Sequence, residues 1–266
     1  MANKGLEFEW CIYHLIALKN SKKYKSDADS KKASQVFKTA DANVRKSAAS
    51  AIAVVEKTYG VVKSVEKKSG GGTEPKTDLL IHAGSKKLKC SLKYGGSVQL
   101  SSGGIKTTVA FLTGVVKNLS KASKISTAQS KEMLKFLAQM ENEYGSLGSV
   151  PKAQAEKMLA NAEDYNAKLQ SILGSRRQPT VSDKYIALKL AIIEEAMTGK
   201  YTFANKPDLS ADHILSETSI KKIDKKFVEE MSKKTSVRLA LKGRGKKLVA
   251  GKEVRLNEVV VRFDTV

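Results

Sequence analysis

Cysteine and histidine are scarce in this 266-residue chain, and their scarcity excludes whole classes of site. The two cysteines, Cys11 and Cys90, form no CxxC motif and no pairing pattern, which is typical of a protein from a reducing compartment. The three histidines, His14, His82 and His213, lack the spacing of zinc ligands. We therefore expect neither a disulfide framework nor a structural zinc site.

Long hydrophobic runs are also lacking. The apolar run over residues 10–17 is short and contains His14, so we expect neither a signal peptide nor a membrane span. The expected location is the cytoplasm, and no membrane partner is expected.

Acidic residues are few beside the basic ones. Lysine and arginine number 48 against 27 acidic residues, which gives a formal net charge of +21. Such an excess favours phosphate contacts, so the expected partner is DNA, with RNA not excluded. Only seven of the basic residues are arginine, the side chain whose planar fork reads guanine. The composition therefore favours contacts to the nucleic-acid backbone over base-specific readout.

Apolar patterning predicts an α+β fold for the first 120 residues. Alternation over 87–94 is typical of a strand, and Gly84-Ser85 is expected as a tight turn before it. The expected elements, in chain order, are helices at 5–18 and 41–57, strands at 61–67, 78–83 and 87–94, a short extended segment at 97–102, and a helix at 106–119.

Beyond residue 120 the pattern is mainly helical and returns to β at the end of the chain. Apolar residues at helical spacing run to about residue 198, and Tyr201–Phe203 is expected as a short strand. Strands over 237–241 and 253–263 flank KGRGKK, which is interpreted as a basic turn. We therefore divide the chain into an α-β-β-β-α unit over 1–120 and a mainly helical basic region over 121–266, which is either a second domain or an elaboration packed on the first unit.

One segment combines residue types that suit phosphodiester hydrolysis. Asp78 opens one strand, and Lys93 lies 15 residues later toward the end of the next, so the two meet if these strands are antiparallel neighbours. Alternation places Ser91 and Lys93 on one face and Cys90 on the other. A carboxylate can hold a hard cation against the phosphate, and a lysine can orient the attacking water. The segment therefore predicts a site that depends on Mg²⁺ or Mn²⁺.

These residues resemble the signature of the PD-(D/E)xK nuclease superfamily. Pro75 and Asp78 match its first half, and Ser91-Leu92-Lys93 stands where acid-x-Lys is expected. The resemblance implies a restriction-endonuclease-like mixed sheet flanked by helices, followed here by a largely helical extension and a terminal β segment. It also implies a metal-dependent DNA nuclease, expected to be an endonuclease, in a phage-encoded, restriction or repair role. Many members act as dimers to cut both strands, so a homodimer is a candidate arrangement.

The resembled family often adds an acid from its first helix, where this chain has Glu7 and Glu9. Both lie on largely apolar helix faces, and an unpaired carboxylate is costly there. His14 is within reach of Glu7, whereas Glu9 has no local partner, so a metal or an active-site lysine is the more natural explanation for it. The alternative is a partly wet carboxylate at the edge of a buried face. We prefer Glu9 to Glu7 as the acid that would hold the metal together with Asp78.

Serine at position 91 departs from the family signature, because a hydroxyl is a poorer metal ligand than a carboxylate. Ser91 could act through a water, and Glu74 or Gln99 could complete the site. The alternative is a degenerate site in a non-catalytic basic protein that binds DNA or RNA.

Two basic segments are candidates for gripping the nucleic-acid backbone. A solvated surface segment is the alternative interpretation of each. The candidate residues are Lys242, Arg244, Lys246 and Lys247 of KGRGKK, and Arg176 and Arg177, which precede Pro179.

Overall fold

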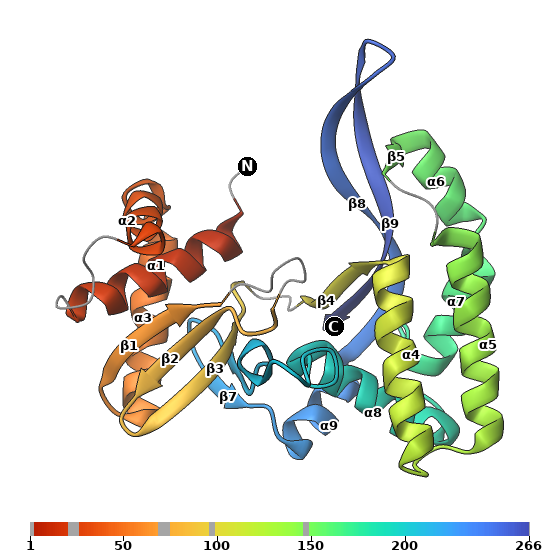
Figure 1. The fold of residues 1–266 in the computed structure, drawn as a ribbon, viewed down its shortest axis with the longest axis horizontal. Coiled ribbons are helices and arrows are strands. Elements are labelled where there is room, and N and C mark those ends of the chain that lie inside the picture. Colours follow the sequence, from red (N-terminus) through yellow and green to blue (C-terminus); the bar gives the residue numbers. More distant parts are fainter. Residues whose placement is uncertain (1–2, 21–26, 69–74, 96–98, 146–148, 266) are drawn as a thin grey trace. The chain divides into compact units, whose positions relative to one another are not determined.

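A computed structural model describes residues 3–20, 27–68, 75–95, 99–145 and 149–265, apart from the side chains of residues 99–102 and 249. It confirms the expected α+β class, with helices and two separate sheets. The chain folds into two compact units (Figure 1). Unit 1 comprises residues 1–98 and 197–227, and unit 2 comprises residues 99–196 and 228–266. Each unit is therefore made from two separate stretches of chain.

Unit 1 begins with helices whose start points are marked in the sequence. The side chains of Asn3, Asp27 and Asp41 each accept backbone N–H groups at a helix start, as N-cap residues do. These helices are α1 (Lys4–Lys19), α2 (Ala28–Thr39) and α3 (Ala42–Tyr59).

A five-stranded mixed sheet completes unit 1. Its strands lie in the order β1-β2-β3-β6-β7. All neighbouring strands are antiparallel except β3 and β6, which are parallel. The strands are β1 (Val62–Lys67), β2 (Leu79–Ala83), β3 (Lys86–Leu92), β6 (His213–Leu215) and β7 (Ile220–Lys222).

One face of this sheet contributes to the hydrophobic core of unit 1. Leu79 and Ile81 of β2 and Leu88 and Cys90 of β3 belong to the same buried cluster as Phe8 of α1. Strand alternation places the intervening residues of β2 and β3 on the opposite face. The expected turn at Gly84-Ser85 is confirmed, since Ala83 pairs with Lys86 across it.

Unit 2 packs helices with a second sheet. Its strand β9 (Lys252–Thr265) pairs with three others, β4 (Gln99–Gly104), β5 (Val150–Pro151) and β8 (Thr235–Val249), all antiparallel. The helices that begin in this unit are α4 (Ile105–Lys121), α5 (Thr127–Tyr144), α6 (Lys152–Ala160), α7 (Glu163–Leu173) and α8 (Asp183–Thr198). A further helix, α9 (Lys225–Lys234), begins in unit 1 and enters unit 2.

Four features differ from the sequence expectation. The units divide at 98/99 rather than near residue 120, so β4 and α4 belong to unit 2 and do not extend the sheet of β2 and β3. Tyr201–Phe203 forms a turn, while β6 and β7 were not expected. KGRGKK lies within β8 rather than in the hairpin turn.

Among the described residues, no helix is long and apolar enough to cross a membrane.

Candidate active site at the ends of strands β2 and β3

Asp78 lies directly before β2, against the end of β3. Its backbone N–H donates to the carbonyl of Cys90 at 2.9 Å, continuing the β2–β3 ladder by one residue. Its carboxylate Oδ2 accepts the backbone N–H of Leu92 at 2.6 Å. Leu92 is the middle residue of Ser91-Leu92-Lys93, so the acid and this tripeptide meet as the sequence predicts.

Ser91 and Lys93 occupy the sheet face opposite the hydrophobic core. Their neighbour Cys90 is fully buried in the core cluster, and alternation turns Ser91 away from it. Ser91 is nonetheless buried, and Lys93 is half-buried. The backbone N–H of Lys93 donates to the carbonyl of Leu215 at 2.9 Å, which fixes the end of β3 against β6.

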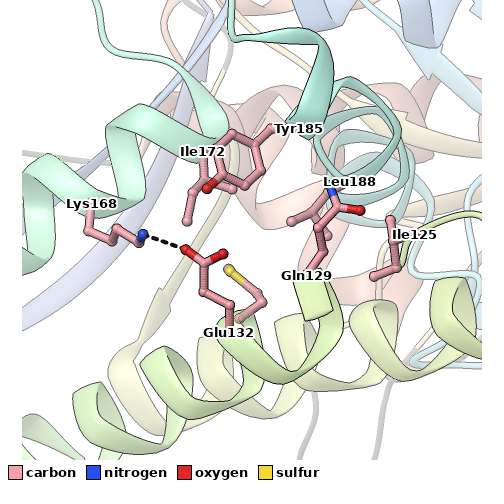
Figure 2. A pocket seen from close by; sticks show the side chains of 8 residues that line it. Ile125, Gln129, Glu132, Lys168, Ile172, Tyr185 and Leu188 are labelled. Carbon is pink, nitrogen blue, oxygen red and sulfur yellow. Dashed lines mark hydrogen bonds and ion pairs between the residues drawn. The ribbon is translucent and has the colours of Figure 1, made fainter. Parts of the chain in front are cut away.

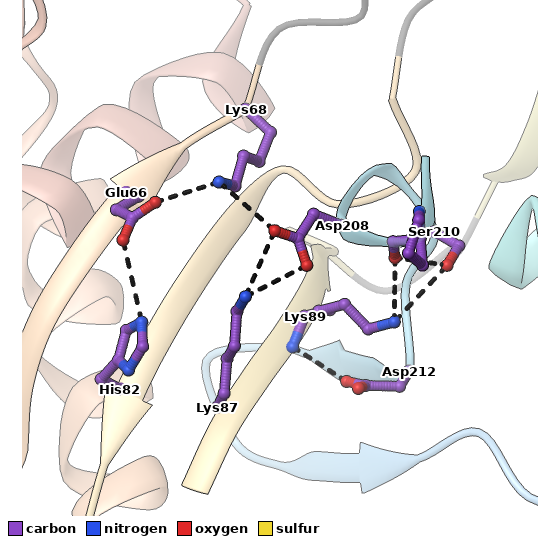
Figure 3. A network of polar contacts seen from close by, with 9 residues as sticks. Glu66, Lys68, His82, Lys87, Lys89, Asp208, Ser210 and Asp212 are labelled. Atoms are coloured by element: carbon purple, nitrogen blue, oxygen red, sulfur yellow. Dashed lines mark hydrogen bonds and ion pairs between the residues drawn. The ribbon is translucent and has the colours of Figure 1, made fainter. Parts of the chain in front are cut away.

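The same sheet face carries a network of charged side chains (Figure 3). Lys87 donates to both carboxylate oxygens of Asp208 at 3.1 and 3.2 Å, and Lys68 lies 3.8 Å from that carboxylate. The hydrogen bond from Lys87 is the largest cause that lowers the pKa of Asp208. Lys89 donates to the carbonyl of Pro207 at 3.0 Å. This face is therefore rich in lysine, and the 207–210 segment neutralises part of its charge.

Glu9 has a lysine as its partner, one of the two kinds of partner, a metal or a lysine, that the sequence left open. Its carboxylate is buried and forms an ion pair with Lys67, the last residue of β1. Lys67 pairs across the sheet with Leu79, the residue next to Asp78. No signal near Glu9 in the sequence could reveal this partner, because Lys67 lies on a strand that reaches α1 only in the folded unit.

A second set of residues missed by the sequence analysis joins β6 to β3 and α3. The carboxylate of Asp212 accepts the backbone N–H of Lys89 at 2.8 Å and contacts His213 Nδ1 at 2.5 Å. His213 Nε2 in turn lies 2.9 Å from the hydroxyl of Tyr59. His213 is buried, and its two polar contacts hold it at the junction of three elements. This chain of contacts explains how so short a strand as β6 is held in place.

The described residues supply few metal ligands. They contain no group of three or more His, Cys, Asp or Glu side chains placed to hold an ion. Glu74 and the side chain of Gln99, both considered as replacements for the missing acid, lie outside the described part of the chain. The backbone of Gln99 belongs to β4 of unit 2, whereas Asp78 and Ser91 belong to unit 1.

The donor set suits a magnesium ion held mainly by water and substrate. Mg²⁺ usually keeps several waters and binds through one or two carboxylates together with substrate phosphates. Asp78 offers a carboxylate at the strand end, and Ser91 offers a hydroxyl on the same face. A single-acid site of this kind fits the residues present, whereas an all-protein cage does not.

The candidate backbone-gripping residues all lie in unit 2. Arg176 and Arg177 are exposed in the loop after α7, as expected. Lys242, Arg244, Lys246 and Lys247 are exposed along β8. Their binding role stays a prediction.

Unit 2 also contains a small pocket between α5, α7 and α8 (Figure 2). Glu132 in its wall accepts hydrogen bonds from Lys168 at 2.8 Å and Lys184 at 3.0 Å, which lower its pKa. The cavity measures about 10 Å³, room for one water at most. Because its acid is paired with two lysines and its volume is small, this pocket is structural.

Comparisons with known proteins found no match for this chain among protein-family models, curated proteins or solved structures. A function is therefore inferred from the residues of this chain and their geometry alone.

Proposed function

We propose that the chain is a metal-dependent nuclease that hydrolyses phosphodiester bonds in DNA, with its active site at the ends of β2 and β3. The observation that carries the proposal is the contact of Asp78 Oδ2 with the Leu92 N–H, 2.6 Å long. This contact places an acid against a Ser-x-Lys segment at one sheet end. The formal net charge of +21 supports a polyanionic substrate.

Each residue of the site has a role that its chemistry allows. Asp78 would hold Mg²⁺ or Mn²⁺, which when bound supplies Lewis-acid polarisation of a phosphoryl oxygen. Lys93 would orient the attacking water and offset the negative charge that develops on the phosphate. The Ser91 hydroxyl would position a water on the same face. Glu9 is given no role in the site, because its partner Lys67 lies opposite Leu79 on the core face of the sheet, away from Ser91 and Lys93.

A second candidate function is non-catalytic binding of DNA or RNA. The specific observation in its favour is that the described residues offer only Asp78 and Ser91 at the sheet end, without a cluster of three ligands. Under this alternative, Lys93 and the neighbouring lysines of β3 contact phosphates without chemistry.

Cleavage of supercoiled and linear DNA with Mg²⁺ or Mn²⁺ tests the proposal. We expect the wild type to cut, and Lys93→Ala to lose roughly 10²–10³-fold in rate, as is typical when one stabilising donor is removed. Lys86→Ala is the matched control, since it removes the same charge from the opposite end of β3. The control should cut at the wild-type rate.

Two results would contradict the proposed active site. A wild type that binds DNA but cuts with neither metal indicates the binding function. Cutting that survives in both Lys93→Ala and Asp78→Asn indicates a contaminating nuclease or another site.

A further inference from the structure

The C-terminal hairpin of unit 2 is longer than the sheet that supports it. Strands β8 and β9 pair from Thr235–Thr265 to Val249–Lys252, and a two-residue turn with positive φ at Ala250 and Gly251 joins them. The outer neighbour of β9 at this end, β5, pairs no further than Leu256. Beyond that point, within the described part of the chain, β8 and β9 pair only with each other and project as a ribbon (Figure 1).

The projecting part, residues 246–255, is here called the distal ribbon. Near the base of the hairpin, Val237 and Val261 are fully buried. In the distal ribbon the described β8 side chains are exposed, and Leu248 is 71% exposed. A two-stranded hairpin without a packed face is marginally stable in water. Core packing therefore does not explain why the chain extends the ribbon this far.

The distal ribbon is strongly basic. Its four basic residues stand against one acid, Glu253. Glu253 pairs with Lys246 at 2.9 Å. The basic residues are Lys246, Lys247, Lys252 and Arg255.

These cations occupy both faces of the distal ribbon. Lys246 pairs across the strands with Arg255, so these two side chains share one face. Lys247 pairs with Val254 and thus points to the other face, which Lys252 shares because it lies two residues from Val254. Like charges directly opposite each other destabilise a hairpin, and Glu253, which pairs with Lys246, offsets only one of the two positive charges on this face. Each face therefore keeps positive charge that an external anion would stabilise.

We propose that the distal ribbon enters the major groove of B-form DNA. That groove, about 12 Å wide, admits a two-stranded β-ribbon. Phosphates line both of its walls, which matches cations on both faces, and the exposed Leu248 can contact base edges such as the thymine methyl. The major groove of A-form RNA is deep and narrow and does not admit the ribbon. The inference rests on the proposed function only in taking DNA as the partner. It does not require that the protein cuts the DNA.

Binding to matched duplexes without divalent metal tests the inference separately from cleavage. The ribbon variant changes Lys246, Lys247, Lys252 and Arg255 to Gln, and the control changes the exposed Lys31, Lys38, Lys46 and Lys57 of unit 1 to Gln. Both variants lose four positive charges. The measured quantity is the slope of the logarithm of DNA affinity against the logarithm of salt concentration. We expect this slope to become less steep by about 2–4 in the ribbon variant and by less than 1 in the control. The wild type should bind duplex DNA at least tenfold more tightly than duplex RNA of the same sequence.

Equal effects of the two variants would overturn the inference, as would equal affinity for duplex DNA and RNA. A crosslinking measurement does not depend on the stability of the ribbon variant. Leu248→Cys introduces an exposed thiol, whereas Cys11 and Cys90 are fully buried, and burial raises the pKa of both thiols. A photocrosslinker attached at position 248 should capture duplex DNA several-fold more efficiently than one attached through Ala53→Cys on the surface of α3. Equal capture from the two positions would also overturn the inference.

Discussion

The side chain of Glu9 is 11% exposed on a buried helix face, with the ammonium group of Lys67 against its carboxylate. Removing one partner of such a pair leaves a charge without compensation. We expect Lys67→Met to lower the free energy of unfolding by about 2–3 kcal/mol, slightly less than for a fully buried pair. The double variant Glu9→Gln/Lys67→Met should recover most of that loss in urea denaturation. Equal stability of the single and double variants would show that the pair contributes nothing.

Lys189 of α8 is also buried, and its Nζ donates to the carbonyls of Thr235, at 3.1 Å, and Pro179. Burial lowers its pKa from 10.5 to about 8. Below pH 8 both folded and unfolded chains carry this proton, so the cost of burying the charge is fully present. Between pH 8 and 10.5 the folded chain loses the proton first, and stability rises with pH. Urea denaturation from pH 7 to 10 should show this rise in the wild type relative to Lys189→Met; a constant difference would contradict it.

The β2–β3 turn depends on one glycine. Gly84 has φ +54°, and a Cβ at this position would lie 2.3 Å from the carbonyl oxygen of Tyr59 at the end of α3. Gly84→Ala therefore combines backbone strain with a clash against a backbone atom. We expect it to cost about 3 kcal/mol or more, against about 1–2 kcal/mol for Gly251→Ala, where φ is also positive but no atom lies within 4 Å. Thermal unfolding of both variants measures the difference, and equal losses would show that the clash is relieved.

Elements with local signals could be predicted from the sequence, and elements made by distant pairing could not. Gly84-Ser85 marks its turn because only a few residues adopt that backbone, and the alternation of β3 sets which face Ser91 occupies. Strand β6 has three residues and is held by β3, more than 120 residues earlier, so no local pattern reveals it. Gly243 and Gly245 suggest a turn, yet they flank a bulge within β8.

At the scale of the whole molecule, the proposed chemistry and the proposed groove contact belong to different units. Asp78, Ser91 and Lys93 lie in unit 1, whereas the distal ribbon lies in unit 2. Substitutions in one unit should therefore leave the fold of the other intact. The chain passes between the units three times, because residues 197–227 return to unit 1 before β8 begins.

Residues 197–227 contribute β6 and β7 to the sheet of unit 1, so they determine which fragment of that unit can fold. Residues 1–98 alone lack β6, so the Lys93 N–H loses the Leu215 carbonyl and the Lys89 N–H loses the Asp212 carboxylate. Lys89 lies in β3 and Lys93 directly follows it, so the exposed edge of this strand would carry unpaired donors beside the candidate site. We expect 1–98 alone to unfold without a cooperative transition. The same residues joined by a flexible linker to 197–227 should unfold cooperatively in urea, followed by circular dichroism. A cooperative transition in 1–98 alone would show that β1, β2 and β3 are stable without β6 as a parallel neighbour. The end of β3 that leads to Lys93 would then form without residues 197–227.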